Sequence, residues 1–343
     1  ATWHHWGDYI GPAQLIAAGA LPLVDIPLQY GFGPSLILTQ GCKINCWSSM
    51  YWFTSLSSIA MVYLLAAIAL KLNRSRSTLQ ICFVLIIVMA SCLLWTQYPP
   101  TVGSPLSTPS TTGVRFLPGI IMLAYTLHRS YSVDLQYSSE KIGHILWLAC
   151  IIWSPEAGIQ STAVWVPYFI WTRTFKNIGE NNVVNFFRTI ALLLTILLLG
   201  LAIFAVVFQF IFGSWPLPKE YIIYLLNVPG SMPINPNGTV WFAIACLMCW
   251  LIGFLFSQRK PLDIKFNRAS WLIALLCLAN FTYFLGRSHD NNILNLMPYL
   301  TLVLFATRAI IPAGAIKALT TTLLSATLGF VMIFGWALFT NLK

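Results

Sequence analysis

Residues 187–212 read FRTIALLLTILLLGLAIFAVVFQFIF and contain Arg188 as their single charged side chain. A helix that crosses the hydrocarbon core of a bilayer needs about 20 consecutive, mainly apolar residues. This stretch is long enough to cross the core with residues to spare. It therefore predicts a transmembrane helix, and it sets the class of fold in which the rest of the chain is interpreted.

Further apolar runs recur along the chain, separated by short polar segments. They cover residues 48–71, 78–97, 114–130, 141–153, 158–173, 240–257, 269–285, 293–308 and 317–340. Together with 187–212 they predict an all-α, polytopic membrane protein with about ten crossings. The runs 141–153 and 158–173 are short. Three interpretations of this pair are open: a tight hairpin, a tilted pair, or one kinked element around Ser154-Pro155-Glu156.

The composition excludes a water-soluble domain. Hydrophobic residues make up 58% of the 343 residues and charged residues only 8%, whereas soluble domains usually carry about 25% charged residues. The net charge of +10 is spread over short gaps between apolar runs and forms no basic stripe, so we expect no nucleic-acid partner. Lipid must be the solvent for much of the surface.

The distribution of lysine and arginine fixes the orientation. If residues 1–47 lie outside the cytoplasm, 14 of the 19 bases fall in cytoplasmic gaps, and those outside are Lys43, Arg115, Lys219, Arg287 and Lys343. The positive-inside rule strongly prefers this arrangement. We therefore expect a multi-pass protein of the inner (plasma) membrane whose active face is extracytoplasmic.

This topology divides the chain into two parts. Residues 1–47 form a first extracytoplasmic loop with an interfacial helix, and residues 48–343 form a transmembrane helical domain with outer loops 98–113, 214–239 and 286–292. The chain begins abruptly with polar and aromatic residues, so we expect a first span upstream of Ala1. Loops carry function more often than spans do, which directs attention to the outer face.

The first loop predicts a short helix that lies along the membrane surface. Residues 12–18 suit a helix because Pro12 fits a first turn and Gly19 can end it. Asp8 would then stand just before the helix and Asp25 on the return of the chain. Asp8 is either a functional acid or a helix cap, and Asp25 either a functional acid or a residue that braces the loop by a hydrogen bond.

The order of residues in this loop resembles the first extracytoplasmic loop of the GT-C glycosyltransferases. The matching positions are Asp8, Tyr9, Pro12-Ala13, Gly19, Asp25 and Tyr30-Gly31. The resemblance covers the loop closely and the rest of the chain by architecture. It implies a GT-C-like fold whose first span precedes the loop, a polyprenyl-phosphate-linked sugar as donor, and a glycan, lipid or protein outside the cytoplasm as acceptor.

The resemblance also implies roles for the residues of the loop. Transfer by direct displacement needs a general base near the acceptor hydroxyl, for which Asp8 is the first candidate and Asp25 the second; Tyr30 is expected to contact substrate. Some members of the class depend on a divalent metal such as Mg or Mn, and His4, His5 and Asp8 are the candidate ligands. They lack the fixed spacing of a helical metal motif such as H-E-x-x-H.

A second polar cluster interrupts two apolar runs at residues 286–292, within which Arg287 and His289 suit the phosphate of the leaving lipid. The alternative is a polar hairpin turn capped by Asp290 or Asn291. Arg115 opens a predicted span, and either binds phosphate or extends its side chain to the interface. Glu156 is an acid between two apolar halves, and is either functional or part of a structural ion pair.

Most of the eight cysteines lie inside apolar runs, where they act as small hydrophobic residues. This includes the C-x-x-C pair of Cys246 and Cys249, for which core packing is a better interpretation than metal or redox chemistry. Cys42 and Cys46 precede the first run and can pair as a disulfide if that segment is outside the cytoplasm. The aromatic segment 214–239 lines an acceptor groove or forms an interfacial aromatic belt.

Three other classes of protein remain as alternatives to a glycosyltransferase. A lipid-linked glycan polymerase or ligase would use outer-loop Arg and His on similar substrates, but relies less on a carboxylate in the first loop. A transporter or flippase tends to show internal repeats and charges at the middle of the membrane, and neither pattern is visible in the sequence. A non-catalytic subunit of a larger membrane complex is the third.

Overall fold

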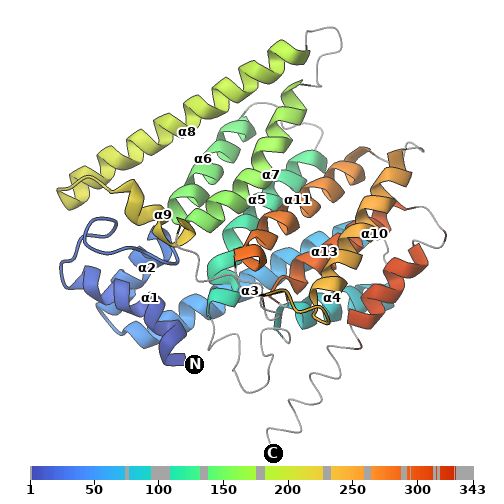
Figure 1. The fold of residues 1–343 in the computed structure, drawn as a ribbon, viewed down its shortest axis with the longest axis horizontal. Coiled ribbons are helices and arrows are strands. Elements are labelled where there is room, and N and C mark those ends of the chain that lie inside the picture. Colours follow the sequence, from blue (N-terminus) through green and yellow to red (C-terminus); the bar gives the residue numbers. More distant parts are fainter. Residues whose placement is uncertain are drawn as a thin grey trace, which may run out of the picture. The chain divides into compact units, whose positions relative to one another are not determined.

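The computed structural model describes residues 2–73, 77–93, 109–131, 138–174, 182–226, 233–258, 264–286, 292–293, 295–311, 314, 317–327 and 329. The secondary structure within these ranges is helical, and no strand occurs in them; an isolated bridge pairs Pro22 with Ile26. The predicted all-α class is therefore confirmed for this part of the chain (Figure 1).

The helices pack as two compact units. One unit contains residues 1–5, 54–120 and 228–343, and the other contains residues 6–53 and 121–227. Three helices, α1 (Thr2–Ala17), α3 (Cys46–Asn73) and α5 (Gly113–Tyr131), contribute residues to both units.

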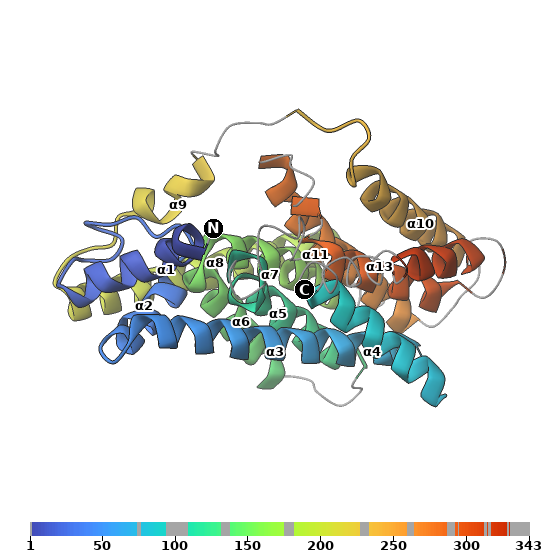
Figure 2. The same ribbon diagram turned by 90° about the horizontal axis from the view of Figure 1, so that it is seen from below.

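The unit that contains the first loop is built from short and long helices around a hairpin. Its helices besides parts of α3 and α5 are α1 (Thr2–Ala17, from Trp6), α2 (Phe32–Cys42), α6 (Ser138–Trp153), α7 (Pro155–Thr174), α8 (Asn182–Phe212) and α9 (Pro218–Leu226). α6 and α7 pack closely along their lengths, and α8 lies against both. α1 and α2 lie side by side in both views (Figures 1 and 2), joined by a hydrogen bond from the Thr39 hydroxyl to the carbonyl of Ala13.

The other unit is centred on α13 (Met297–Ile310). It also contains α4 (Thr78–Leu93), the 3-10 turn η3 (Pro109–Thr111), α10 (Val240–Gln258) and α11 (Ile264–Gly286). α13 packs against α4, α10 and α11, and every residue from Met297 to Thr307 is buried. A helix that is apolar all round belongs in the interior of a bundle, which explains this central position.

The predicted apolar runs coincide with helices wherever they fall in the described ranges. Three of these helices are long and apolar enough to cross a membrane: α3, α8 and residues 240–257 of α10. α4 and α13 are apolar but shorter. The run 317–340 is helical over residues 317–327, and its remainder lies largely outside the described residues. Membrane-spanning character is thus supported for part of the predicted set of ten.

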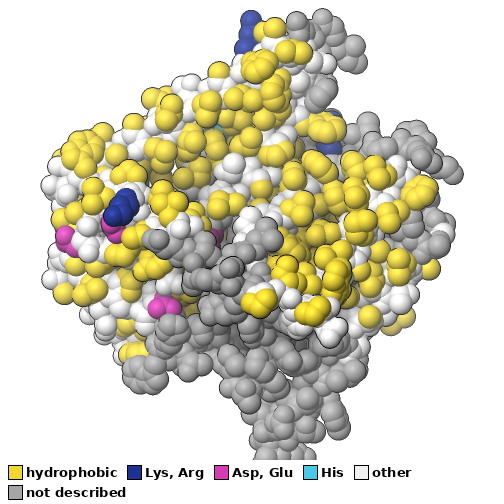
Figure 3. All heavy atoms as spheres, viewed as in Figure 1, with side chains coloured by type: hydrophobic (Ala, Val, Ile, Leu, Met, Phe, Trp, Pro, Cys, Tyr) yellow, Lys and Arg dark blue, Asp and Glu magenta, His cyan; other side chains and the backbone are white. Residues whose placement is uncertain are grey.

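Exposed apolar side chains on α8 indicate contact with lipid. Only Thr189, Leu193 and Phe208 are buried among its described residues, while Leu198 is 66% and Phe210 91% exposed. In the space-filling view much of the surface is covered by hydrophobic side chains, with few charged groups among them (Figure 3). Contiguous apolar surface of this size is rare on proteins that are surrounded by water, and it mostly marks interaction sites with proteins or membranes.

The runs 141–153 and 158–173 form two separate helices, α6 and α7, packed as a hairpin. Ser154 lies between them and acts as the N-cap of α7, because its hydroxyl accepts a hydrogen bond of 3.1 Å from the amide of Ala157. Pro155 occupies the first position of α7, where its missing N–H has no cost. The single kinked element is therefore excluded.

The first helix differs from the sequence prediction. A helix was expected over residues 12–18 with Pro12 in its first turn, but α1 begins at Thr2 and contains Pro12 in its interior. One missing backbone hydrogen bond does not end a helix that buries Tyr9, Ile10 and Ala13 along one face, since tertiary packing supplies most helical stability. The predicted end is correct, because Gly19 follows the helix with φ +104°.

Candidate functional site

Asp8 lies in the middle of α1, on the outward side of the helix. Tyr9, Ile10 and Ala13 are at most 3% exposed and form the inner face, whereas the half-buried Asp8 is turned away from them by the helical repeat of 3.6 residues. The proposal that Asp8 caps the helix is wrong, because the helix begins at Thr2. Since Pro12 has no N–H, it cannot donate the usual helical hydrogen bond to the carbonyl of Asp8.

Residues 18–31 connect α1 to α2, and a turn within this segment contains Asp25. The carboxylate of Asp25 accepts a hydrogen bond of 2.8 Å from the amide of Leu21, and Leu23 has the uncommon φ of +58°. The amide of Leu23 donates to the carbonyl of Ile26 at 3.1 Å. Asp25 thus makes the loop-bracing bond that was one of its two interpretations, while its exposed side chain keeps the other open.

Tyr30, at the end of this turn, stacks on Tyr9. The ring centroids are 4.3 Å apart and the ring planes differ by 7°. Tyr9 is 1% exposed, so the stack attaches the return of the loop to the buried face of α1. The stack therefore holds the helix that carries Asp8 against the segment that carries Tyr30. Both tyrosines belong to the predicted loop motif.

Gly31 brings the first loop against the junction between α6 and α7. Gly31 has φ +97°, and a Cβ atom built there would stand 2.3 Å from the Cβ of Ser154 and 2.3 Å from the carbonyl oxygen of Trp153. Only glycine fits such a close approach. Glu156 follows two residues after Ser154, in the first turn of α7, so the loop and this acid belong to one region of the structure.

The position of Glu156 suits a negative charge. It is half-buried and lies near the amino end of a helix, where the macrodipole and free N–H groups stabilise an anion.

α9 covers the same region from the predicted outer segment 214–239. The amide of Leu217, just before α9, donates to the carbonyl of Leu23 at 2.9 Å, and the Tyr221 hydroxyl donates to the carbonyl of Ile151. Burial raises the pKa of Tyr221 well above its usual value, so the phenol keeps the proton that it donates. The segment thus includes a helix that packs on the first loop.

Apolar packing beneath the loop fixes these elements in place. Leu23, Leu28 and Phe32 from the first loop and α2 form a buried cluster with Phe208 of α8. Burying side chains of this kind contributes about 1.5–3 kcal/mol each relative to full exposure. The loop is accordingly a packed part of its unit, and its polar residues have defined positions.

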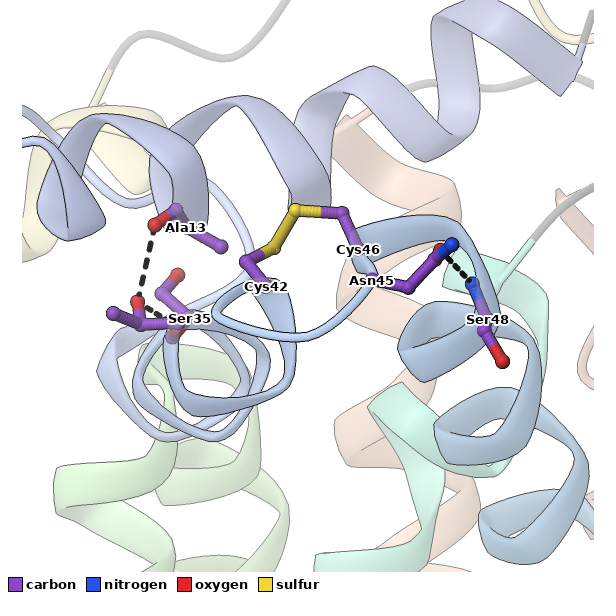
Figure 4. Close-up of a disulfide and its surroundings, with 7 residues drawn as sticks. Ala13, Ser35, Cys42, Asn45, Cys46 and Ser48 are labelled. Carbon is purple, nitrogen blue, oxygen red and sulfur yellow. Dashed lines mark hydrogen bonds between the residues drawn. A yellow bond between two sulfur atoms is a disulfide. The ribbon is translucent and has the colours of Figure 1, made fainter.

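A disulfide closes the far end of the first loop. Cys42, at the end of α2, is bonded to Cys46, at the start of α3 (Figure 4), as the sequence allowed. Next to it the ring of Trp47 stacks on Trp6 of α1, with centroids 5.3 Å apart. Disulfides persist in oxidising compartments, so this bond agrees with an extracytoplasmic position of the loop.

The remaining predicted phosphate-binding residues are placed only in part. Arg115 is 7% exposed in the first turns of α5, and its guanidinium lies 3.5 Å from the carbonyl oxygen of Ser110. Arg287 and His289 lie outside the described residues. Whether these cations and Asp8 share one site therefore stays a prediction.

The predicted metal ligands lie on α1, but only Asp8 has a described side chain. Among the described residues, no three His, Cys, Asp or Glu side chains are close enough to hold an ion, but the side chains of His4 and His5 are outside that set. α1 is helical through residues 4–8, and residues four apart in a helix share a face. Whether His4, His5 and Asp8 hold a divalent ion therefore stays a prediction.

Cys246 and Cys249, the C-x-x-C pair, are both buried in α10. Their burial agrees with the interpretation as packing residues.

The sequence prediction missed one polar cluster in this unit. Arg129, Glu140, His144 and Arg173 come together from α5, α6 and α7, although the basic residues had been interpreted only as topology signals. The signal in the sequence was His144 and Glu140 near the start of an apolar run, where polar residues are unexpected.

No family model matches the chain, and no curated protein or solved structure matches it.

Proposed function

We propose that the chain is a membrane glycosyltransferase of the GT-C kind, which transfers a hexosyl or pentosyl group from a polyprenyl-phosphate donor to a glycan, lipid or protein acceptor. The observation that carries the proposal is the first loop, in which Asp8 lies on the outward side of a helix that is stacked through Tyr9 onto Tyr30. A general base must be held rigidly beside the acceptor hydroxyl. The packing described above supplies that rigidity.

In the proposed reaction the acceptor oxygen forms a bond to the anomeric carbon of the donor sugar. The bond from that carbon to the phosphate oxygen breaks, and its electron pair leaves with the polyprenyl phosphate. Asp8 takes the proton of the acceptor hydroxyl, with Asp25 as the second candidate. Arg287 and His289 would stabilise the negative charge of the leaving phosphate, and Arg115 and Glu156 are the further candidate substrate-binding residues. A Mg or Mn ion held by His4, His5 and Asp8 would add positive charge beside the substrate.

The proposal places the reaction at the extracytoplasmic face of the inner (plasma) membrane, in the synthesis of cell-envelope glycans. The excess of bases in the opposite gaps and the disulfide between Cys42 and Cys46 support this orientation. The proposed topology keeps the ten predicted spans. The mostly apolar exterior of α8 supports a bilayer as its surroundings.

The proposal is tested by incubating the protein in proteoliposomes with a panel of polyprenyl-phosphate hexoses and pentoses and cell-envelope glycan acceptors, and measuring sugar transfer. Asp8→Asn removes the base while keeping the shape of the side chain, so transfer should fall about 100-fold or more. Asp25→Asn tests the second candidate, and should change transfer by less than tenfold if Asp8 is the base. Full activity of Asp8→Asn would remove Asp8 from the mechanism. Lipid-dependent movement of a sugar without formation of a new glycosidic bond would instead identify a flippase.

A further inference from the structure

A second group of polar residues lies at the other ends of the helices in the unit that contains the first loop. Arg129 is in the last turn of α5, Glu140 and His144 are in the first turns of α6, and Arg173 is in the last turn of α7. Positively charged side chains near the carboxyl ends of helices are favourably placed. None of these four residues takes part in the proposed transferase reaction.

Arg173 already has a partner. Its guanidinium forms an ion pair of 2.6 Å with Glu140, with the two side chains 40% and 20% exposed, and it lies over the ring of Phe169 at 5.0 Å from the centroid. This pair is therefore electrically balanced. Glu140 neutralises Arg173, so the uncompensated positive charge of the cluster comes from another residue.

His144 is held as a neutral donor. Its Nδ1 accepts a hydrogen bond of 3.2 Å from the indole N–H of Trp165, which leaves the proton of the neutral ring on Nε2. Trp165 reaches this position because residue 143 is glycine: a Cβ there would stand 2.0 Å from the Cη2 atom of Trp165. The donor on Nε2 is thus set by packing.

Arg129 adds a second positive charge to the cluster, whose acid, Glu140, is paired with Arg173. Its guanidinium lies 6.0 Å from the centroid of Tyr168, and its charge acts on His144 together with that of Arg173. The Nε and Nη1 atoms are buried, yet they have no hydrogen-bond partner among the residues that the structure describes. The same holds for the buried hydroxyl of Thr174, next to Arg173. Buried donors without an acceptor are costly, so this arrangement calls for an anionic acceptor.

We propose that Arg129, with His144 nearby, binds the phosphate group of an anionic phospholipid. Arginine suits phosphate because its planar donors match the phosphate oxygens. The rings of Trp165, Tyr168 and Phe169 are buried beside the cluster and pack on one another, so they hold its polar side chains in place. Basic pockets between transmembrane helices on the cytoplasmic side recognise anionic headgroups, and the topology from the positive-inside rule places this cluster on that side. Free inorganic phosphate offers the same oxygens, but anionic headgroups are concentrated at the cytoplasmic surface of the bilayer, where the proposed topology places the cluster.

The proposal is tested on the full chain in detergent by native mass spectrometry, with phosphatidylglycerol and phosphatidylcholine as probes. The wild-type protein should retain one tightly bound phosphatidylglycerol that phosphatidylcholine does not replace. Arg129→Gln should weaken its retention about tenfold or more, since one charge-assisted interaction is lost. Arg188→Gln is the matched control, because Arg188 is an exposed base near the start of α8, and it should retain the lipid as wild type does.

Folding and the source of the phosphate are controlled separately. Each variant must show the wild-type melting temperature in phosphatidylcholine; if Arg129→Gln does not fold, Arg129→Lys carries the test and should weaken retention several-fold, because lysine lacks the planar donors. Equal losses in Arg129→Gln and Arg188→Gln would show a general charge effect and overturn the proposal. Displacement of the lipid by a tenfold excess of inorganic phosphate would assign the site to the free ion and overturn the lipid assignment.

Discussion

Gly31 and Ser154, far apart in the sequence, approach so closely that a Cβ on Gly31 would stand 2.3 Å from the Cβ of Ser154. Through this contact the return of the first loop lies directly against the hairpin junction of α6 and α7. The contact joins two of the regions that were selected from the sequence for different reasons. Tyr30 and Glu156 each lie within two residues of it, so a change here should affect the whole candidate site.

We expect Gly31→Ala to destabilise the protein more than Gly19→Ala does. Both glycines have positive φ, +97° and +104°, but only Gly31 has neighbours within 4 Å of the added methyl group. The backbone strain of about 1–2 kcal/mol is common to both variants, whereas the overlap with Ser154 adds about 1–3 kcal/mol to Gly31→Ala alone. Thermal unfolding in detergent measures the difference. Equal melting temperatures for the two variants would mean that the loop is not packed on the junction.

The sequence predicted the helices well because lipid imposes a simple rule on them. Every backbone group in a bilayer must be satisfied within the segment, so apolar runs such as 187–212 could be read directly as helices, and α8 covers that run. The same reasoning failed at Thr2, where α1 begins, because Pro12 gave a local start signal that packing of Tyr9 and Ile10 overrode.

The site was predictable only as a set of residues. Asp8, Asp25 and Tyr30 were selected from their order in the sequence, but the stack of Tyr30 on Tyr9 depends on how the turn folds back. The hydrogen bond of Asp25 to Leu21 was one of two open interpretations. The Arg129 cluster was missed because its members come from three helices, and each base alone is explained by topology. Contacts between distant segments are not encoded in local patterns.

Tyr221→Phe should lower the free energy of unfolding of the protein by about 1 kcal/mol. Ile151 is in the last turn of α6, where carbonyl groups lack helical partners, and the Tyr221 hydroxyl donates to its oxygen. Tyr224→Phe is the control, since Tyr224 lies on the same helix and is 43% exposed. Thermal unfolding at neutral pH should separate the two variants. A melting temperature of Tyr221→Phe equal to that of the control would show that the bond contributes nothing.

The contribution of Tyr221 should also depend on pH at the alkaline end. Burial raises the pKa of this phenol in the folded protein, whereas in the unfolded chain it stays near about 10. The stabilisation is therefore fully present below about pH 10 and is lost as the pH rises from there through the raised value. The difference between wild type and Tyr221→Phe should be constant from pH 6 to 9. A decrease within that range would contradict the raised pKa.

The disulfide provides a test of orientation. In intact cells a membrane-impermeant maleimide should label Cys42 and Cys46 only after treatment with an impermeant reductant, because the pair is bonded and is proposed to lie outside. Cys82 is a free, exposed cysteine at the start of α4, on the cytoplasmic side of the proposed topology, and should be labelled only after the membrane is opened. Variants that keep only Cys42 and Cys46, or only Cys82, make the readout specific. The reverse pattern would invert the topology.

Two substitutions separate the structural role of Tyr30 from its proposed role in substrate binding. Tyr30→Phe keeps the ring that stacks on Tyr9 and should retain the wild-type melting temperature. Tyr30→Ala removes a stack worth about 0.5–1.5 kcal/mol beyond its buried area and should lower it. If the hydroxyl of Tyr30 contacts substrate, Tyr30→Phe will raise KM in the transfer assay while kcat changes little, because that contact is made in the ground state as well as the transition state. Tyr30→Ala should reduce kcat too, since Asp8 on α1 loses its support. Wild-type KM and kcat in both variants would show that Tyr30 neither contacts substrate nor supports Asp8. The loop would then not be needed to position Asp8.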